Sequence, residues 1–542
     1  MSKRLSPKST LDTLKTEAKR RLKAMRAADP AITLRAAQLA VARDYGFDGW
    51  MALKAALADI ALGRLSPDER AEAFLRQCHW DGDAAAARRI LARHPEVARH
   101  DLLTAIVCGD VAEVERRLAA DPGAARRKGG PLGWEPLLYL AYGQFDGANA
   151  LTIAGRLLDL GADPNAWFND GWDNPFTVLC GVIGQGEGGR APHPQADALA
   201  DLLIERGAEP FDTQALYNTS IADDDTTWLE RLHAACVARG EDLRWRAAGR
   251  GLSANFEVAT IDYLLGNAVT NDHQKRVIWL IAHGANPSGV NAYSGHPHHT
   301  QALLQGLTGT AGLLAQRGAR VMHLTGPLAF QVAAMRRSRS AVQALAAAQP
   351  ELLSDPGPLI QAAAQGAADV VALLLEAGMP PDLAQRDGRR ALHSAASSGS
   401  VETARLLIEA GADIEARGTQ YDASPLSFAH FFGRAAMVDY LTPLTIDVFT
   451  LALANRAERL AEVLTAQPEL ANARRRNGRT PLFHLPDDED DAVAITRLLL
   501  AHGADPTLTD STGMTAERAA RDRGLDDAAD LMRSGRGSIT PT

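Results

Sequence analysis

Cysteine is scarce in this chain of 542 residues, and its spacing excludes two classes of small stabilised domain. The four cysteines are Cys78, Cys108, Cys180 and Cys236, and no two of them form a CxxC pair. A zinc ribbon needs closely paired cysteines, and a disulfide framework needs a dense set of them in a short chain. We therefore expect all four to act as small apolar side chains in a reducing compartment.

Long apolar runs and an excess of positive charge are also missing. No stretch of about 20 consecutive apolar residues occurs, so we expect no membrane-spanning helix. The opening MSKRLSPKST lacks the apolar segment of a secretory signal, and we therefore expect a cytoplasmic protein. The net charge is −9, opposite in sign to that of proteins that coat nucleic acid.

The common catalytic and cofactor motifs GxxxxGK[ST], HExxH, GxSxG and the EF-hand pattern do not occur. Residues 184–189 match the dinucleotide-binding pattern GxGxxG. A dinucleotide site, however, needs that loop between a β-strand and a helix of a βαβ unit. Residues 174–179 precede it in the position of a repeat helix, so we interpret 184–189 as a flexible insertion. We expect no cofactor and no metal ion, and the sequence favours a non-enzyme while leaving catalysis open.

What the sequence does contain is a recurring word, Gly-Ala-Asp or a variant of it. The spacings between its glycines are 46, 77, 34, 60, 33 and 92 residues, mostly near multiples of 31–38. A second series of helix-opening positions is spaced by 30, 31, 33 and 34 residues. Agreement between two such series indicates an array of repeated units. The glycines are Gly161, Gly207, Gly284, Gly318, Gly378, Gly411 and Gly503, and the second series is Pro297, Pro327, Pro358, Ala391 and Pro425.

Residues 389–415 show what one unit contains. A short helix is predicted from Ala391 and ends at Gly399, where glycine can adopt a positive φ. A second helix carries its apolar residues on one face and stops at Gly411, before a turn into the next unit. One helix pair of this size cannot bury its apolar face alone, so stacked neighbours must complete the core.

This unit resembles the ankyrin repeat, with its Thr-Pro-Leu-His-x-Ala start, central glycine and Leu-Leu-x-x-Gly-Ala-Asp ending. The closest matches are 390–395, 480–484, 135–138 and 498–505. The resemblance implies an all-α ankyrin-repeat solenoid of about 12 to 13 helix-turn-helix units between residues 70 and 535, several of them degenerate. It also implies that the protein binds a protein partner.

The first 62 residues lie outside the array. Residues 10–26 predict a basic amphipathic helix, and residues 34–54 resemble a segment found ahead of ankyrin arrays in uncharacterised bacterial proteins. The basic helix could contact nucleic acid, anionic lipid or the acidic array itself. We expect the following division: a helical segment at 1–62, degenerate capping repeats at 63–129, irregular repeats with long fingers at 130–322, more regular repeats at 323–535, and a tail at 536–542.

Aromatic residues form 5% of the chain but are concentrated between residues 134 and 176. In the ankyrin fold the turn after Gly-Ala-Asp forms a projecting finger, and exposed aromatic side chains there would form a recognition surface. The alternative is that irregular repeats need large side chains to fill the space between their helices. The residues that we predict to contact a partner or ligand in this region are Trp134, Tyr139, Trp167, Phe168, Trp172 and Asp173.

Three histidines, His296, His298 and His299, replace most of a Thr-Pro-Leu-His word. They form an incidental polar turn, a ligand-contacting surface, or a metal or catalytic site, although consecutive side chains diverge around a helix. The acidic runs at 223–225 and 487–491 fall between helices, where aspartate favours helix N-termini. We interpret them as solvated loop caps, with a cation or basic-partner site as the alternative.

The sequence favours a protein–protein interaction scaffold that binds its partner on the concave and finger face of an ankyrin array. The alternative is an enzyme or small-molecule-binding protein whose pocket is formed by the divergent repeats at 130–320, with one of the three histidines as acid or base. We do not expect nucleic acid as a partner, because one short basic helix offers few phosphate contacts.

Overall fold

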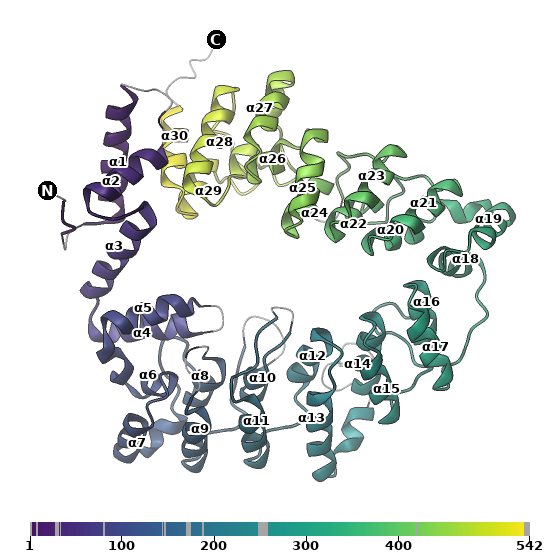
Figure 1. The fold of residues 1–542 in the computed structure, drawn as a ribbon, viewed down its shortest axis with the longest axis horizontal. Coiled ribbons are helices and arrows are strands. Elements are labelled where there is room, and N and C mark those ends of the chain that lie inside the picture. Colours follow the sequence, from purple (N-terminus) through teal and green to yellow (C-terminus); the bar gives the residue numbers. More distant parts are fainter. Residues whose placement is uncertain are drawn as a thin grey trace. The chain divides into compact units, whose positions relative to one another are not determined.

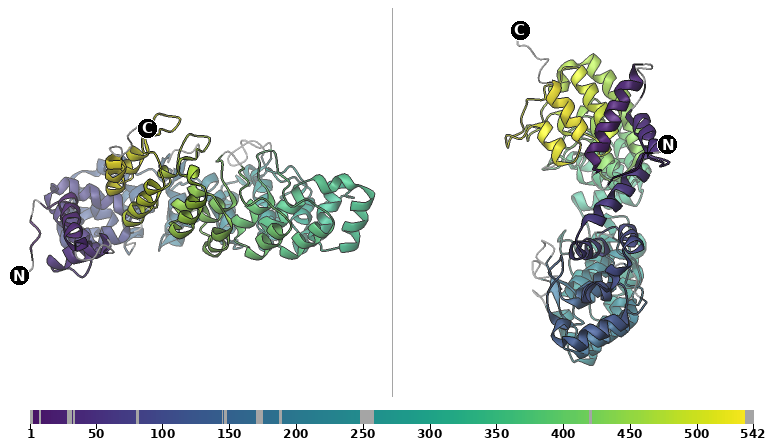
Figure 2. Two further views of the ribbon diagram at one scale, coloured as in Figure 1. Left: turned by 90° about the horizontal axis from the view of Figure 1, so that it is seen from above. Right: turned by 90° about the vertical axis from the view of Figure 1, so that its left-hand side faces the viewer.

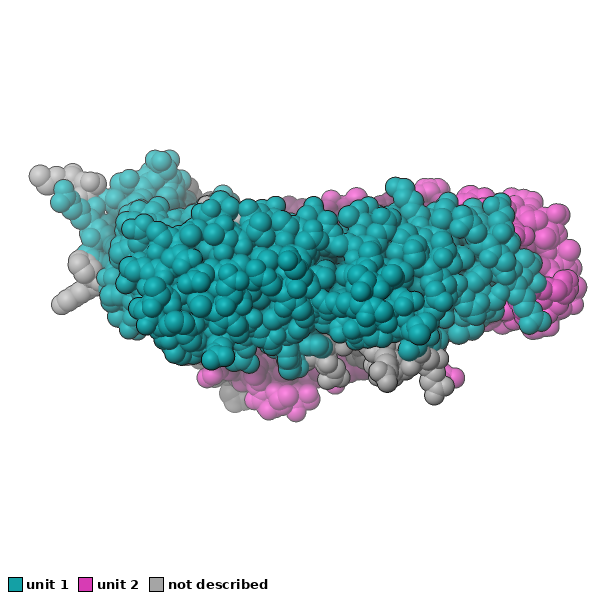
Figure 3. All heavy atoms as spheres, turned by 90° about the horizontal axis from the view of Figure 1, so that it is seen from below, with its two compact units in different colours: residues 1–302, 309–321 teal, residues 303–308, 322–542 magenta. Residues whose placement is uncertain are grey.

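The computed structural model describes residues 3–6, 9–27, 32, 34–79, 82–143, 145, 148–169, 175–186, 189–247, 258–418 and 421–535. Its contacts divide the chain into two units, shown in different colours in Figure 3. Unit 1 contains residues 1–302 and 309–321, and unit 2 contains residues 303–308 and 322–542.

Most of the elements up to α17 belong to unit 1, and they are almost all helical. They are α1 Leu11–Arg26, α2 Leu34–Asp44, α3 Trp50–Arg64, α4 Pro67–Cys78, α5 Ala84–Arg93, η1 Pro95–Arg99, α6 Leu102–Val107, α7 Val111–Ala120, η2 Pro122–Arg126, α8 Pro136–Tyr142, α9 Ala150–Asp159, β1 Trp167–Phe168, β2 Phe176–Thr177, α10 Val178–Ile183, α11 Ala196–Glu205, α12 Thr213–Ala222, α13 Thr227–Ala238, η3 Asp242–Arg246, α14 Thr260–Thr270, α15 Gln274–Ala282, α16 His298–Leu304 and α17 Thr308–Gln316.

Unit 2 continues the same pattern of short helices. Its elements are α18 Gly326–Met335, α19 Arg339–Ala348, η5 Pro350–Ser354, α20 Gly357–Ala364, α21 Ala368–Glu376, α22 Ala391–Ser398, α23 Val401–Glu409, α24 Pro425–Phe431, α25 Ala435–Leu441, η6 Thr442–Leu444, α26 Val448–Leu453, α27 Ala457–Ala466, η7 Pro468–Asn472, η8 Pro481–Phe483, α28 Glu489–Ala501, α29 Ala516–Asp522 and α30 Asp526–Gly535.

From α4 onward the helices form pairs, and within each unit neighbouring pairs pack on one another (Figure 1). We call the first helix of a pair the inner helix and the second the outer helix. In unit 1 the inner helices α4, α6, α8, α10, α12 and α14 contact one another in order, and in unit 2 α18, α20, α22, α24 and α26 do the same. In unit 2 the neighbouring pairs run side by side in the left view of Figure 2.

The repeat number is close to the expected one. Within the described residues, twelve α-helical pairs run from α4 to α27, and η8 with α28 and α29 with α30 add two more, which makes fourteen. The sequence predicted about 12 to 13. The all-α ankyrin-type solenoid is confirmed, and the pair α22–α23 has the predicted limits, with Gly399 at φ 83° between its helices.

The Gly-Ala word, with Gly-Met as a variant, ends seven of the outer helices with the same hydrogen bond. All seven predicted glycines have positive φ, and the next residue donates its N–H to the carbonyl five residues earlier, as Ala412 does to Leu407 at 2.9 Å. The alanine side chain is buried there, at 7% exposure for Ala412. Glycine is needed because a Cβ disfavours this backbone conformation. The buried position that follows holds alanine in six of the seven turns and Met379, which is 2% exposed, in the seventh.

Side chains four residues after some of these glycines tie one turn to the next. In unit 1, Asn165 donates to the carbonyl of Gly207 at 3.0 Å and accepts the N–H of Glu209 at 2.7 Å. In unit 2, the carboxylate of Glu415 accepts the N–H of Ile446 at 2.7 Å. These bonds satisfy turn groups that the helices leave unpaired, and they fix the spacing of successive units.

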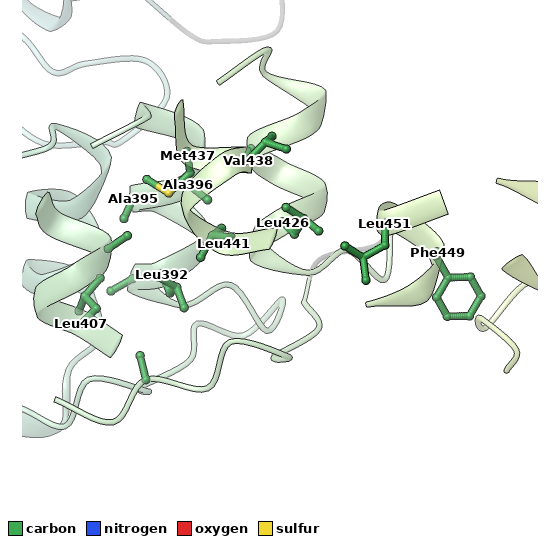
Figure 4. Close-up of a cluster of buried hydrophobic side chains, with 14 of the residues drawn as sticks. Leu392, Ala395, Ala396, Leu407, Leu426, Met437, Val438, Leu441, Phe449 and Leu451 are labelled. Carbon is green, nitrogen blue, oxygen red and sulfur yellow. The ribbon is translucent and has the colours of Figure 1, made fainter. Parts of the chain in front are cut away.

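The apolar core of unit 2 runs continuously through its pairs. Figure 4 shows Leu392 on α22, Leu407 on α23, Leu426 on α24 and Met437 on α25 pointing into the space between these helices. All four are less than 2% exposed. The N-terminal segment has a separate small core, in which Leu14 and Ala18 of the basic helix α1 pack with Val41 and Leu53.

A buried carboxylate joins three successive repeats within unit 2. Asp447 is 1% exposed and accepts hydrogen bonds from Arg417 at 2.9 Å and from Ser424 and Thr450. Burial alone would raise the pKa of Asp447, but Arg417 and Ser424 outweigh it and hold that pKa below its usual value. Arg417 also lies over the ring of Phe449, 5.2 Å from its centre.

Replacing Asp447 by alanine should destabilise unit 2 by about 3–5 kcal/mol, because it leaves buried partners without their acceptor. The control Asp369→Ala removes an exposed pair with Arg337 and should change the unfolding free energy by less than about 1 kcal/mol. Urea unfolding followed by circular dichroism measures both. All eight tryptophans lie at or before Trp279, so their fluorescence follows unit 1 and should respond little. Equal effects of the two substitutions would contradict this role of Asp447.

Candidate functional site

The predicted fingers are antiparallel hairpins between one unit and the next. In the finger before α10, the strands β1 and β2 pair: Trp167 of β1 lies opposite Thr177 of β2, and Phe168 lies opposite Phe176. Single antiparallel bridges close other fingers, such as Gly129 with Trp134, Val290 with Pro297, Ala384 with Arg390 and Gly418 with Ala423. Each of these fingers leads directly into an inner helix.

Most of the predicted aromatic surface is packed inside unit 1. Trp134 is 8% exposed, and its ring stacks on Phe168 with 4.2 Å between ring centres. Tyr139 is 3% exposed, donates its hydroxyl to the carbonyl of Gly129 and accepts the N–H of Leu132, both at 3.0 Å. In this structure Trp134 and Tyr139 therefore stabilise a finger from inside, which corresponds to the large-filler alternative.

Among the predicted aromatic residues that the structure describes, Trp167 faces solvent. Its side chain is 54% exposed, whereas Phe168 beside it is half-buried against Trp134 and Tyr142. The alternation along β1 explains the difference, because successive side chains of a strand point to opposite faces. Trp172 and Asp173 lie outside the described residues.

The three histidines diverge, and their register differs by one residue from the predicted one. The N–H of Asn291 donates to His296 O, closing a turn one residue longer than that from Gln385 to Arg389. Pro297 consequently occupies the helix-capping position of Arg390, and His298 takes the first helical position rather than the leucine position. The extra finger residue, which the proline spacing could not show, causes this correction.

His298 is completely buried, and neither of its ring nitrogens has a hydrogen-bond partner. Burial lowers the pKa of His298 to about 4. His299 is 7% exposed, while His296 is half-buried at the finger. The three rings therefore do not converge on one point, and no group of three or more His, Cys, Asp or Glu among the described residues could hold a metal ion.

The GxGxxG segment follows helix α10 instead of a strand. Gly184, Gln185 and Gly186 all have positive φ, and Gln185 forms a bridge with Arg190. The segment is tied down by Asn218 of α12, whose amide donates to Gly184 O at 3.3 Å and whose carbonyl accepts the N–H of Gly186 at 3.2 Å. An insertion is thus present in the described part of this segment, without a βαβ setting.

The acidic runs serve the helices around them. Asp224 accepts the N–H groups of Lys275 and Arg276 at the start of α15, in the next unit. Arg276 is 3% exposed and donates to Asp225 O at 2.6 Å; burial lowers its pKa to about 10 although the aspartates oppose this. Asp488 caps α28 in unit 2. Sequence reasoning missed Arg276 because nothing in its neighbourhood marks it as buried.

Sequence reasoning also missed a group of exposed aromatic residues in unit 2. In unit 2, Phe431 is 82% and Phe432 48% exposed at the end of inner helix α24, and Tyr421 is 72% exposed on the finger before it. The rings of Phe431 and Phe432 meet edge to face, with 5.1 Å between centres. The local word Phe-Ala-His-Phe-Phe-Gly at 428–433 was a usable signal, since a surface helix rarely carries three phenylalanines.

No helix among the described residues is both long and apolar enough to cross a membrane.

Substituting Trp134 should be far more damaging than substituting Trp167. Trp134→Ala removes a buried ring and should lower the unfolding free energy of unit 1 by about 3–5 kcal/mol. Trp167→Ala removes an exposed ring and should change it by less than about 0.5 kcal/mol. Urea unfolding followed by circular dichroism compares them, and similar effects would mean that Trp134 does not support the finger.

His298 should make unit 1 less stable in acid. Its pKa in the folded chain lies below the usual 6.5, so the unfolded chain takes up the proton first as pH falls. The contribution of His298 to stability is complete above about pH 6.5 and declines by up to about 3 kcal/mol on approaching pH 4. Fluorescence-monitored urea unfolding across this range should show a shallower pH dependence for His298→Leu. Parallel pH profiles would contradict it.

Comparison with known proteins agrees with the geometry. Residues 330–418 and 359–452 match the family model described as ankyrin repeats (3 copies). The chain is also similar to YahD of Escherichia coli (strain K12), whose name describes it as an ankyrin repeat protein, with 29% identity over 191 residues that cover 33% of this chain and 94% of YahD. The stacked helix pairs, the glycine-capped turns and these matches together show that the chain is an ankyrin repeat protein.

Proposed function

We propose that the protein is an interaction scaffold that binds a protein partner on its fingers and inner helices, the concave and finger face of an ankyrin array. Ankyrin repeats are generally modules of this kind. A stack of helix pairs supplies a preorganised surface, so binding orders few additional groups. The cytoplasmic location and bacterial source expected from the sequence remain part of this proposal.

One observation carries the proposal: exposed aromatic side chains are confined to the fingers and inner helices. Among the described residues, the aromatic side chains that face solvent are Trp167, Tyr293, Tyr421, Phe431 and Phe432. The exposed large apolar residues on the outer helices are aliphatic instead, namely Leu151, Val237 and Ile278. Aromatic residues contribute disproportionately to binding energy at interfaces, which supports one face as the binding face.

Phe431 and Phe432 are the strongest anchor that this face offers in unit 2. The corresponding helix-end positions of the flanking inner helices hold small or aliphatic residues, Ser397 and Ser398 on α22 and Leu453 and Ala454 on α26. A partner can therefore approach closely on both sides of the aromatic pair. Trp167 and the half-buried Phe168 and His296 remain in the proposed surface of unit 1, whereas Trp134, Tyr139, His298 and His299 are too deeply buried to contact a partner.

The other functions considered from the sequence have less support. His298 and His299 are 0% and 7% exposed, so they offer little accessible acid or base for catalysis. The basic helix α1 packs into the N-terminal segment, where Lys3 and Arg21 lie 3.6 Å and 3.5 Å from Asp44. That arrangement leaves less free positive charge for phosphate contacts.

The test is photo-crosslinking in the cells that make the protein. A photoreactive phenylalanine analogue is placed at position 431 and, as the matched control, at 278 on an outer helix. We expect one discrete protein adduct at 431, absent at 278 and reduced at least about tenfold by Phe432→Ala. Ile278→Ala should leave the adduct unchanged. Equal labelling at both positions, or none at 431, would overturn the proposal.

A further inference from the structure

Two neighbouring repeats of unit 1 carry insertions between their inner and outer helices, and a cavity lies between these insertions. The short turn between inner and outer helix consists of Gly399 and Ser400 in the regular pair α22–α23. The corresponding connection runs from Tyr142 to Ala150 after α8, and from Ile183 to Ala196 after α10. The described parts of these connections contribute the walls of a cavity of about 200 Å³.

The second insertion folds back over the helix that precedes it. The N–H of His193 donates to Val182 O of α10 at 2.9 Å, and the N–H of Gln185 donates to Arg190 O at 2.8 Å. The hydrogen bonds of Asn218 to Gly184 and Gly186 fix the start of this insertion. These bonds fix Arg190 and His193 at the cavity wall, so the site is formed before any ligand arrives.

The cavity combines apolar walls with two hydrogen-bond donors. Tyr142, Phe145, Gly181 and Pro192 provide apolar surface, and Arg190 and His193 also line it. The hydroxyl of Tyr142 donates to Thr177 O at 2.7 Å, which orients its ring. Gly181 is required beside it, because a Cβ there would lie 2.4 Å from the Tyr142 ring.

The tautomer of His193 follows from its surroundings. Its Nδ1 accepts the N–H of Gln195 at 3.0 Å, so in the neutral ring the proton is on Nε2. Burial lowers the pKa of His193, which favours the neutral ring at pH 7. The ring therefore offers an Nε2–H donor, beside a guanidinium that is always charged.

We propose that this cavity binds a small monocarboxylate with an apolar body. The carboxylate accepts hydrogen bonds from the planar fork of Arg190 and from His193 Nε2–H, and the body lies against Tyr142 and Phe145. Carboxylate geometry matches an arginine fork, and the cavity is smaller than the roughly 300–1,000 Å³ typical of drug-sized ligands. This site lies at the inner-to-outer turns and contains none of the three histidines, although its wall residue Tyr142 also contacts Phe168 of the finger. The inference does not depend on the proposed scaffold function, because it concerns binding of a small ligand in the cavity.

Calorimetric titration of the full chain at pH 7.5 with sodium benzoate tests the proposal, and benzamide serves as the neutral, isosteric control. We expect saturable benzoate binding and affinity for benzamide at least about tenfold weaker, since a charge-assisted hydrogen bond is lost. Arg190→Gln should weaken benzoate binding at least about tenfold. Arg206→Gln, which removes an exposed ion pair of the same unit, should leave it unchanged.

Circular dichroism and thermal melting establish that each variant is folded. Arg190→Lys retains the charge but loses the fork, and it should bind benzoate with intermediate affinity. Should Arg190→Gln not fold, the discrimination between benzoate and benzamide by the unaltered chain, with the Arg190→Lys value, decides the outcome. Absence of saturable benzoate binding at millimolar concentration, equal binding of benzamide, or equal effects of Arg190→Gln and Arg206→Gln would overturn the proposal.

Discussion

No helix pair of this protein can bury its apolar face by itself, and the rest of the structure depends on that constraint. Inner helices such as α20, α22 and α24 are covered only because neighbouring pairs stack on them. The glycine-capped turn sets the spacing of the stack, and side chains such as Asn165 and Glu415 carry hydrogen bonds from one turn to the next. Each unit is therefore stable through its neighbours, and a change at one turn is transmitted to the adjacent pair.

Buried polar groups reinforce the same coupling. Asp447 collects donors from three successive units, and Arg276 is held by carbonyls of the preceding unit. Each of these groups would be costly to bury alone, because an unpaired charge in the interior loses its hydration. Paired in this way, they couple each of these units to its neighbour.

Departures from the regular repeat produce the surfaces that can recognise other molecules. Where the inner-to-outer turn is lengthened after α8 and α10, a cavity opens with Arg190 and His193 in its wall. Where the repeat is regular, Phe431 and Phe432 project from the end of α24 without any insertion. The two features use different physics: the first encloses a small volume with oriented donors, and the second offers apolar area to a large partner.

The sequence by itself determined the repeat, its helix limits around Ala391 and Gly399, and the need for left-handed glycines, because these follow from local backbone preference and helical periodicity. It also located the aromatic concentration at 134–176 and the insertion at 184–189. Only the tertiary structure decided which aromatic side chains face solvent. Trp134 is buried and Trp167 is exposed, and Phe431 has the largest exposed fraction among the described aromatic residues. Burial depends on what the neighbouring unit places opposite a residue, and a single extra finger residue placed His298 at the first helical position of α16 instead of the leucine position. Local patterns carry no information about that opposing surface.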